Sequence, residues 1–267
     1  MEFLKTIKRR SFISEAVYVF LNIGLAVLLM VIIRTTGSIW LAFAIVVIGK
    51  WRIFAVRPRF WLAHIQVNLV NIIVSLGYVV LLYVVNSASI DDLQTLLIQS
   101  GLVMLDIMWL LFLKSQSKRK YIVIQAGVAL FLGITAIYSL SYNWIASPVV
   151  LLVWLVGYAT ARQVLCSYDD EKHIELLSLT WGLMLAEVGW LAYHWTIAYR
   201  LPIITNILLP QVSIILICFG FLAYKSYDSF YHHQKVRIND IILPLLFTIS
   251  IVSILLLAFN NVITGIN

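Results

Sequence analysis

The chain has 267 residues, of which 62% are hydrophobic and only 12% charged, and its formal net charge is +7. An ordinary soluble domain carries roughly a quarter charged residues, so this composition excludes a soluble globule. A nucleic-acid-binding protein would gather its cations on one folded face. Here they fall in short clusters between apolar runs, which excludes nucleic acid as a partner and points to anionic lipid head groups.

Charged breaks divide the chain into nine segments of about the 20 apolar residues that a transmembrane helix needs. We therefore predict an all-α fold, a polytopic transmembrane helical bundle that forms one integral membrane domain over residues 1–267, with no soluble domain. The predicted spans are 15–33, 37–53, 61–85, 93–113, 121–140, 148–166, 174–197, 210–226 and 241–260.

The N-terminal segment has basic residues followed by a long apolar run, and no A-x-A-like cleavage site follows it. This order predicts an uncleaved signal anchor. The second predicted span is the shortest, because its unbroken apolar core covers only 39–48. It would have to recruit Trp51 and Phe54 at the membrane interface.

The 19 Lys and Arg residues are distributed very unevenly over the connections between the predicted spans. All except Arg34 and Arg200 fall in alternate connections, which the positive-inside rule places in the cytoplasm. The sequence thus predicts a cytoplasmic N-terminus and an external C-terminus. We expect an integral protein of a prokaryotic cytoplasmic membrane.

The connection after the second span contains Lys50, Arg52, Arg57 and Arg59, interleaved with aromatic residues. Such a loop is typical of contact with anionic lipid head groups. Lys50 and Arg57-Pro58 also stand in the order K-x6-R-P, which resembles the first motif of the type 2 phosphatidic-acid phosphatase family. The P-S-G-H and Ser-Arg-x5-His segments of that family do not occur, so no nucleophilic histidine is carried over.

The third predicted helix carries one polar face, formed by His64, Asn68, Asn71, Ser75 and Tyr78 at i, i+4, i+7, i+11 and i+14. Unsatisfied polar groups are costly in hydrocarbon, so this face should turn toward neighbouring helices. It could form interhelical hydrogen bonds or line a cavity for water or substrate.

Asp106 in the fourth span and Arg162 in the sixth are expected roughly 10 Å from the cytoplasmic ends of their helices. We predict that they form an ion pair. Alternatively, Arg162 reaches the head groups, and Asp106 is protonated or bonded to His64.

The seventh predicted helix has two distinct faces. Thr180, Glu187 and His194 lie on one side at heptad spacing, and Gly182, Ala186 and Gly189 form a stripe of small residues about a third of a turn away. We expect the small residues to pack against a partner helix, the polar residues to face a polar interior, and the helix to lie at the centre of the bundle. Glu187 is a candidate proton or cation site, or else a buried hydrogen-bonding group.

The remaining connections carry weaker signals. The apolar segment 200–209 predicts a short interfacial or re-entrant piece. Asp228 and His232 have the i, i+4 spacing of metal ligands, but no third ligand is near in sequence. We predict no catalytic residue, no metal site and no cofactor.

Three functions are compatible with these features. The first is transport by a small carrier, with a polar intramembrane pathway along His64, Asp106, Arg162, Glu187 and His194. The second is a non-catalytic assembly subunit that binds a protein partner or a second copy. The third is an intramembrane enzyme for lipid-linked substrates.

Overall fold

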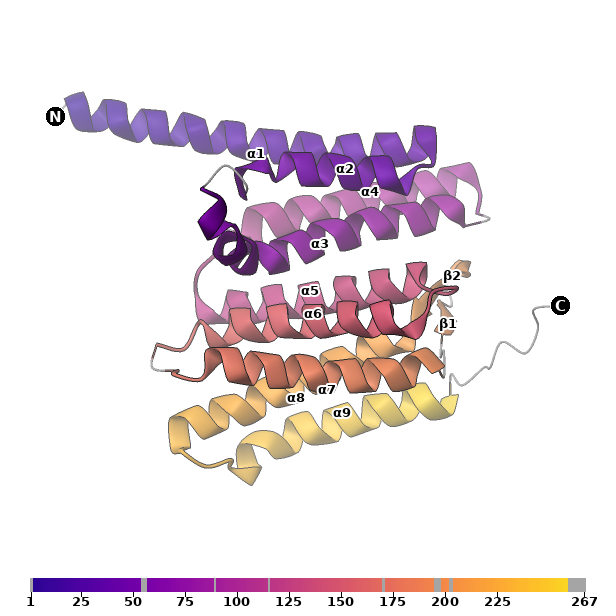
Figure 1. The fold of residues 1–267 in the computed structure, drawn as a ribbon. Helices are drawn as coiled ribbons and strands as arrows, with labels where there is room; N and C mark the ends of the chain where they lie inside the picture. Colours follow the sequence, from indigo (N-terminus) through magenta and orange to yellow (C-terminus); the bar gives the residue numbers. More distant parts are fainter. Residues whose placement is uncertain are drawn as a thin grey trace.

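The computed structural model describes the backbone of residues 2–53, 57–88, 90–114, 116–169, 171–194, 198–201 and 204–258. Nearly all of this backbone is helical, and the helices lie side by side in one bundle (Figure 1). In chain order they are α1 (Glu2–Thr36), α2 (Ile39–Gly49), α3 (Trp61–Ser87), α4 (Asp92–Met108), α5 (Arg119–Leu140), α6 (Ala146–Leu165), α7 (Ile174–His194), α8 (Gln211–His233) and α9 (Ile238–Ala258). A π-helical segment, η3 (Trp109–Leu113), extends α4.

Among the residues that the structure describes, eight helices are long and apolar enough to cross a membrane, which makes the chain a multi-pass membrane protein. α2 is the exception, because its 11 residues rise only about 16 Å. The predicted second crossing is therefore not confirmed: the helix ends at Gly49, and Trp51–Ile53 forms a 3-10 turn, η1. Gly37, at φ 62°, makes the tight turn between α1 and α2 that other residues would adopt only with strain.

The connections rich in Lys and Arg lie at one end of the bundle, on the left in Figure 1. They join α2 to α3, α4 to α5, α6 to α7 and α8 to α9, and the second of two 3-10 turns between α2 and α3 is η2 (Pro58–Phe60). We call this end the basic end. The distribution agrees with the alternation of charge in the sequence, because α2 returns the chain to the end where α1 starts.

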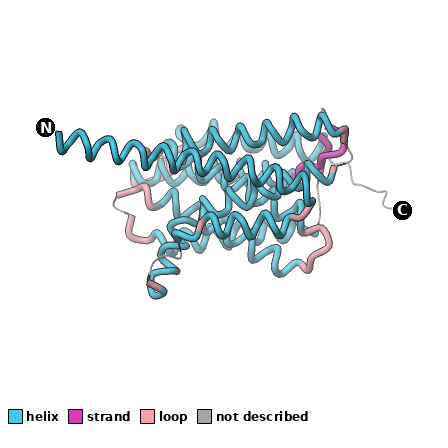
Figure 2. Tube along the Cα trace, turned by 90° about the horizontal axis from the view of Figure 1, so that it is seen from above, coloured by secondary structure: helices cyan, strands magenta, loops and turns pink. Residues whose placement is uncertain are grey.

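The segment at 200–209 lies at the opposite end, where it contributes to an antiparallel hairpin of β1 (Ala198–Leu201) and β2 (Ile204–Pro210) (Figure 2). Ala198 pairs with Pro210 and Leu201 with Ile204, with an irregularity in register before Leu201. The backbone thus forms a terminal hairpin rather than a helix that re-enters the bundle. How far the side chains of 198–208 are exposed lies outside the described residues.

Two apolar clusters form the interior, and α3 belongs to both. Leu69, Val70 and Ile73 in its first half join residues of α5, α6, α7 and α8. Val79 and Leu82 in its second half join residues of α1, α2 and α4. The two groups of helices are therefore held together by successive stretches of one helix.

The closest helix packing occurs between α6 and α7, which contact each other along their length. A Cβ atom built on Gly182 would lie 2.9 Å from the carbonyl oxygen of Trp154, and one built on Gly157 would lie 3.0 Å from Cα of Gly182. Gly189 has Val153 at a similar distance. The prediction that the small-residue stripe of α7 packs against a partner helix is confirmed, and the partner is α6.

We expect Gly182→Ala to destabilise the protein by about 1–3 kcal/mol, because the added methyl group meets a backbone carbonyl that cannot move alone. The measurement is thermal unfolding of the purified protein in detergent. Gly101→Ala in α4 is the matched control, since nothing lies within 4 Å of its added Cβ. Equal unfolding temperatures for the two variants would contradict the proposed backbone contact.

Candidate functional site

An apolar cavity of about 520 Å³ lies between α5, α6, α7 and α8. It exists because α7 follows α6 and α8 packs against α5, whereas α7 and α8 touch each other at few points. Its lining residues are Val123, Ile124, Ala126, Gly127, Leu130, Thr160, Ala161, Val164, Leu165, Leu177, Thr180, Trp181, Met184, Ile217, Gly220, Phe221, Ala223, Tyr224 and Tyr227. Most of them belong to the half of each helix nearest the basic end, and Ile217, Gly220 and Phe221 extend the cavity past the middle of α8.

The cavity extends over the stretch of α8 from Ile217 to Tyr227, about 15 Å along the helix axis. This is about half of the ~30 Å hydrocarbon core, or one leaflet. Met184 and Phe221 line the cavity yet are 52% and 40% exposed, so it opens sideways between α7 and α8. A chain from the surrounding leaflet could enter there.

The few hydroxyl groups in the inner wall are already satisfied within their own helices. Thr160 donates to the carbonyl of Val156 at 2.9 Å, and Thr180 donates to that of Leu176 at 2.9 Å. These bonds leave methyl groups as the main contribution of the two threonines to the cavity. The wall is thus suited to hydrocarbon rather than to a polar solute.

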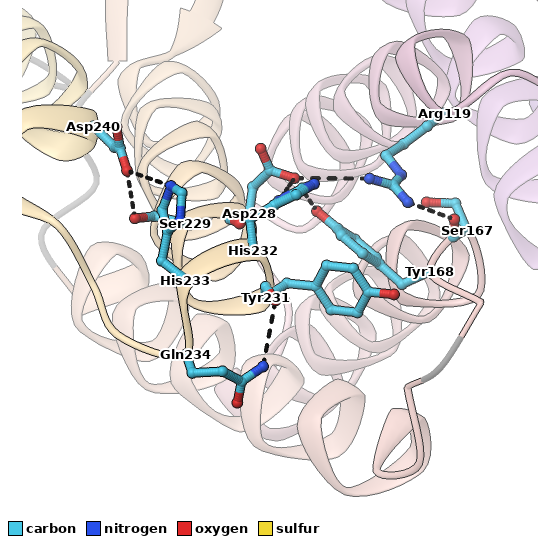
Figure 3. Close-up of polar contacts among 10 residues, drawn as sticks. All are labelled: Arg119, Ser167, Tyr168, Asp228, Ser229, Tyr231, His232, His233, Gln234 and Asp240. Carbon is cyan, nitrogen blue, oxygen red and sulfur yellow. Dashed lines mark hydrogen bonds and ion pairs between the residues drawn. The ribbon is translucent and has the colours of Figure 1, made fainter.

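A polar network closes the basic end of the cavity (Figure 3). The Tyr168 hydroxyl donates to Asp228 Oδ1 at 3.0 Å, and Arg119 lies 3.9 Å from the same oxygen. Its guanidinium group stacks 4.2 Å from the centre of the Tyr168 ring and donates to the carbonyl of Ser167. The network ties the start of α5, the α6–α7 connection and the end of α8 together.

Tyr227 lines the cavity, and its hydroxyl donates to Glu171 in the α6–α7 connection, the segment that also carries Tyr168. Tyr227 therefore links the cavity wall to this network. That hydrogen bond, with one from the His173 backbone N–H, lowers the pKa of the Glu171 carboxyl below its usual value. Burial and the Asp228 carboxylate raise the pKa of the Tyr168 hydroxyl, so it remains a donor. The basic end of the cavity is therefore closed by anionic acceptors, neutral tyrosines and the Arg119 guanidinium group.

The neighbouring histidines brace the end of α8 rather than forming a metal site. His232 Nδ1 lies 2.8 Å from the Asp228 carbonyl oxygen, and His233 lies 3.8 Å from Asp240 at the start of α9 (Figure 3). Ser229 also donates to Asp240, at 2.7 Å. Among the described residues, no group of three or more His, Cys, Asp or Glu side chains could hold a metal ion.

Arg162 forms an ion pair with Glu175 at 3.0 Å, not with Asp106 as the sequence analysis predicted. The Tyr158 hydroxyl donates to the second oxygen of Glu175 at 2.9 Å and lies 3.4 Å from Gln66. The pair forms because the α6–α7 connection folds α7 directly onto α6, which brings Glu175 beside Arg162. These contacts join α3, α6 and α7 at the basic end.

Lys50 turns toward the bundle, although we expected it to contact head groups. Its ammonium group donates to the carbonyl of Asn71 in α3 at 3.2 Å. Burial and, to a smaller extent, nearby Lys114 lower the pKa of Lys50 to about 8, and Asp106 opposes the shift. Lys50, Asn71 and Asp106 are thus brought near one another where α2, α3 and α4 meet.

The first part of the polar face of α3 lies at the edge of the bundle, whereas Tyr78 is buried and donates to the carbonyl of Ala26 in α1 at 3.2 Å. His64 is exposed, and Asn68 donates to its backbone carbonyl at 2.8 Å. Of the other predicted head-group residues, Arg57 and Arg59 are exposed, whereas the side chain of Arg52 lies outside the described residues. Their exposure is compatible with head-group contact, which stays a prediction.

The polar face of α7 points away from the bundle, contrary to the prediction of a polar interior. Thr180, Glu187 and His194 are all exposed, and the buried face is formed by the small residues and Leu185. The expectation that α7 lies at the centre is also wrong, because α6 is its main neighbour. Only Thr180, of the predicted intramembrane candidates, lines the apolar cavity.

The sequence analysis missed the tyrosines that close the cavity. Tyr224, Tyr227, Asp228 and Tyr231 follow each other at i, i+3, i+4 and i+7, which places them on one face of α8. That spacing was a usable signal for a functional or packing face. Arg119 lies three helices earlier, in α5, and has no comparable signal, because its contact with Tyr168 depends on the tertiary fold.

We expect Lys50→Met to raise the unfolding temperature at pH 7. The folded-state pKa of about 8 is below the ordinary 10.5, so the unfolded chain binds more protons between these values and stability rises with pH there. The advantage of the variant should therefore shrink between pH 8 and 10.5. The measurement is thermal unfolding across this pH range.

Lys120→Met at the same end is the matched control, because Lys120 is exposed and should show no such gain. A pH-independent effect of Lys50→Met, or a loss of stability at pH 7, would contradict the burial of a charged ammonium group.

No protein-family model, curated protein or solved structure matches this chain.

Proposed function

We propose that this multi-pass membrane protein binds a membrane lipid, or another amphiphile with a long hydrocarbon chain, from the leaflet at its basic end. The observation that carries the proposal is the apolar cavity of about 520 Å³, which is open between α7 and α8. Its volume lies in the range of pockets that hold small-molecule ligands. Its depth of about 15 Å matches one leaflet.

The chemistry of the wall favours a hydrocarbon chain over a polar solute. A hydrated pathway needs polar side chains along its length, but the wall is built from aliphatic and aromatic residues, and its threonines are satisfied internally. We therefore infer that the carrier predicted from the sequence carries a lipid. The lipid would move along the apolar cavity rather than through a polar channel.

The head group of such a lipid would lie at the basic end, one helical turn beyond the cavity. Lys120 is exposed there, and Asp228 and Tyr168 hold Arg119 next to the basic end of the cavity. These cations suit an anionic phosphate head group. With the positive-inside assignment, which is part of this proposal, the bound lipid comes from the cytoplasmic leaflet.

We expect a phosphatidylglycerol with a diazirine near the methyl end of one acyl chain to label the cavity residues of α5–α8 after irradiation in proteoliposomes. Gly127→Phe should remove most of this labelling, because nothing lies within 4 Å of an added Cβ at Gly127 and the ring would fill the cavity. The measurement is mass spectrometry of the labelled peptides.

Gly101→Phe is the matched control for this experiment. Nothing lies within 4 Å of its added Cβ either, but Gly101 lies in α4 and does not line the cavity. It should be labelled like the wild type. Labelling spread evenly over the exposed faces of α1 and α9, or unchanged by Gly127→Phe, would overturn the proposal.

A further inference from the structure

Glu187 places a carboxylate on the membrane-facing side of α7. It lies about 20 Å along the helix from Ile174 and about 10 Å from His194, which puts it well inside the hydrocarbon region. The residue is exposed, and it has neither a hydrogen bond nor an ion pair with any other residue that the structure describes. Hydrocarbon tails cannot satisfy a carboxylate, so an ionised Glu187 at this depth needs a polar or charged partner.

Glu187 also lines a second, shallow hollow of about 430 Å³ on the outer surface of α6 and α7. The hollow is lined by Val150, Leu183, Ala186, Glu187, Trp190 and Leu191. It shares no lining residue with the cavity between α5 and α8. The surface of the hollow is almost entirely apolar, so the body of an occupant must be apolar and any charged group must lie at its edge.

Trp190 lies one turn after Glu187 on the same face of the helix, and both residues line the hollow. His194 packs against the indole at 4.7 Å between ring centres, in an edge-on arrangement. This contact limits the positions that the Trp190 ring can take. An indole face beside a carboxylate is a favourable environment for a cation, through cation–π attraction and direct charge pairing.

We propose that the hollow at Glu187 binds a lipophilic organic cation, an ammonium or phosphonium group carried on an apolar body. The carboxylate neutralises the charge, Trp190 contacts it through the aromatic face, and the aliphatic wall holds the body of the ligand. Within the described part of the chain, no Lys or Arg lies on the membrane-facing side of α7 to neutralise Glu187 instead.

The test is binding of radiolabelled tetraphenylphosphonium to the purified full-length protein in detergent, measured by equilibrium dialysis with an excess of unlabelled cation to subtract partitioning. We expect saturable binding that Glu187→Gln weakens at least about tenfold, since a charge pair in a low-dielectric site is worth more than the roughly 1.4 kcal/mol of a tenfold change. Glu187→Asp should retain part of the binding. Trp190→Leu should weaken it, and Trp190→Phe should weaken it less.

Glu175→Gln is the matched control, because it removes a carboxylate from the same helix about 18 Å away, where the partner is Arg162. It should bind the cation like the wild type. Absence of saturable binding, or equal binding by the wild type and Glu187→Gln, would overturn the proposal. So would a second polypeptide, or a second copy of the chain, that native mass spectrometry finds bound to the wild type and missing from Glu187→Gln.

Discussion

The close approach of α6 and α7 determines the geometry of both proposed sites. Gly157 and Gly182 let the two backbones come nearly into contact, so α7 follows α6 and leaves α8 at a distance. The space between α7 and α8 becomes the apolar cavity. The same packing uses the small-residue face of α7, which turns the face with Glu187 outward. One contact between glycines thus opens a cavity on one side and exposes a carboxylate on the other.

Hydrogen bonds and ion pairs hold the ends of the helices where apolar packing alone would leave them free to slide. At the basic end, Arg162 and Glu175 link α6 to α7, and Asp228 links α8 to Arg119 and Tyr168. At the opposite end, Arg34 in α1 pairs with Asp92 in α4 at 2.6 Å. Few specific forces act between apolar helices in lipid, so such contacts fix the register of the bundle.

The sequence predicted the helices well because the length of an apolar run and the position of charges are local properties. It also separated the two faces of α7 correctly, since helical spacing alone places Gly182 and Glu187 on different sides. It correctly predicted that the small-residue face packs against another helix, but not that the face with Glu187 turns outward, because that depends on which helices lie beside α7. Arg162 shows the same limit, because its partner depended on how the α6–α7 connection folds. The cavity arises from the separation of two helices and has no pattern of its own in the sequence.

The shortness of α2 has a consequence for the bilayer itself. A helix of about 16 Å cannot match a hydrocarbon layer of about 30 Å, and α2 is bounded by the Gly37 turn at one end and by Lys50 at the other. Lipids beside it must tilt, shorten or let their head groups sink, which costs a fraction of a kcal/mol for each ångström of mismatch. We therefore expect the membrane to be locally thinned beside α2. Head groups and water would reach deeper there than around the longer helices.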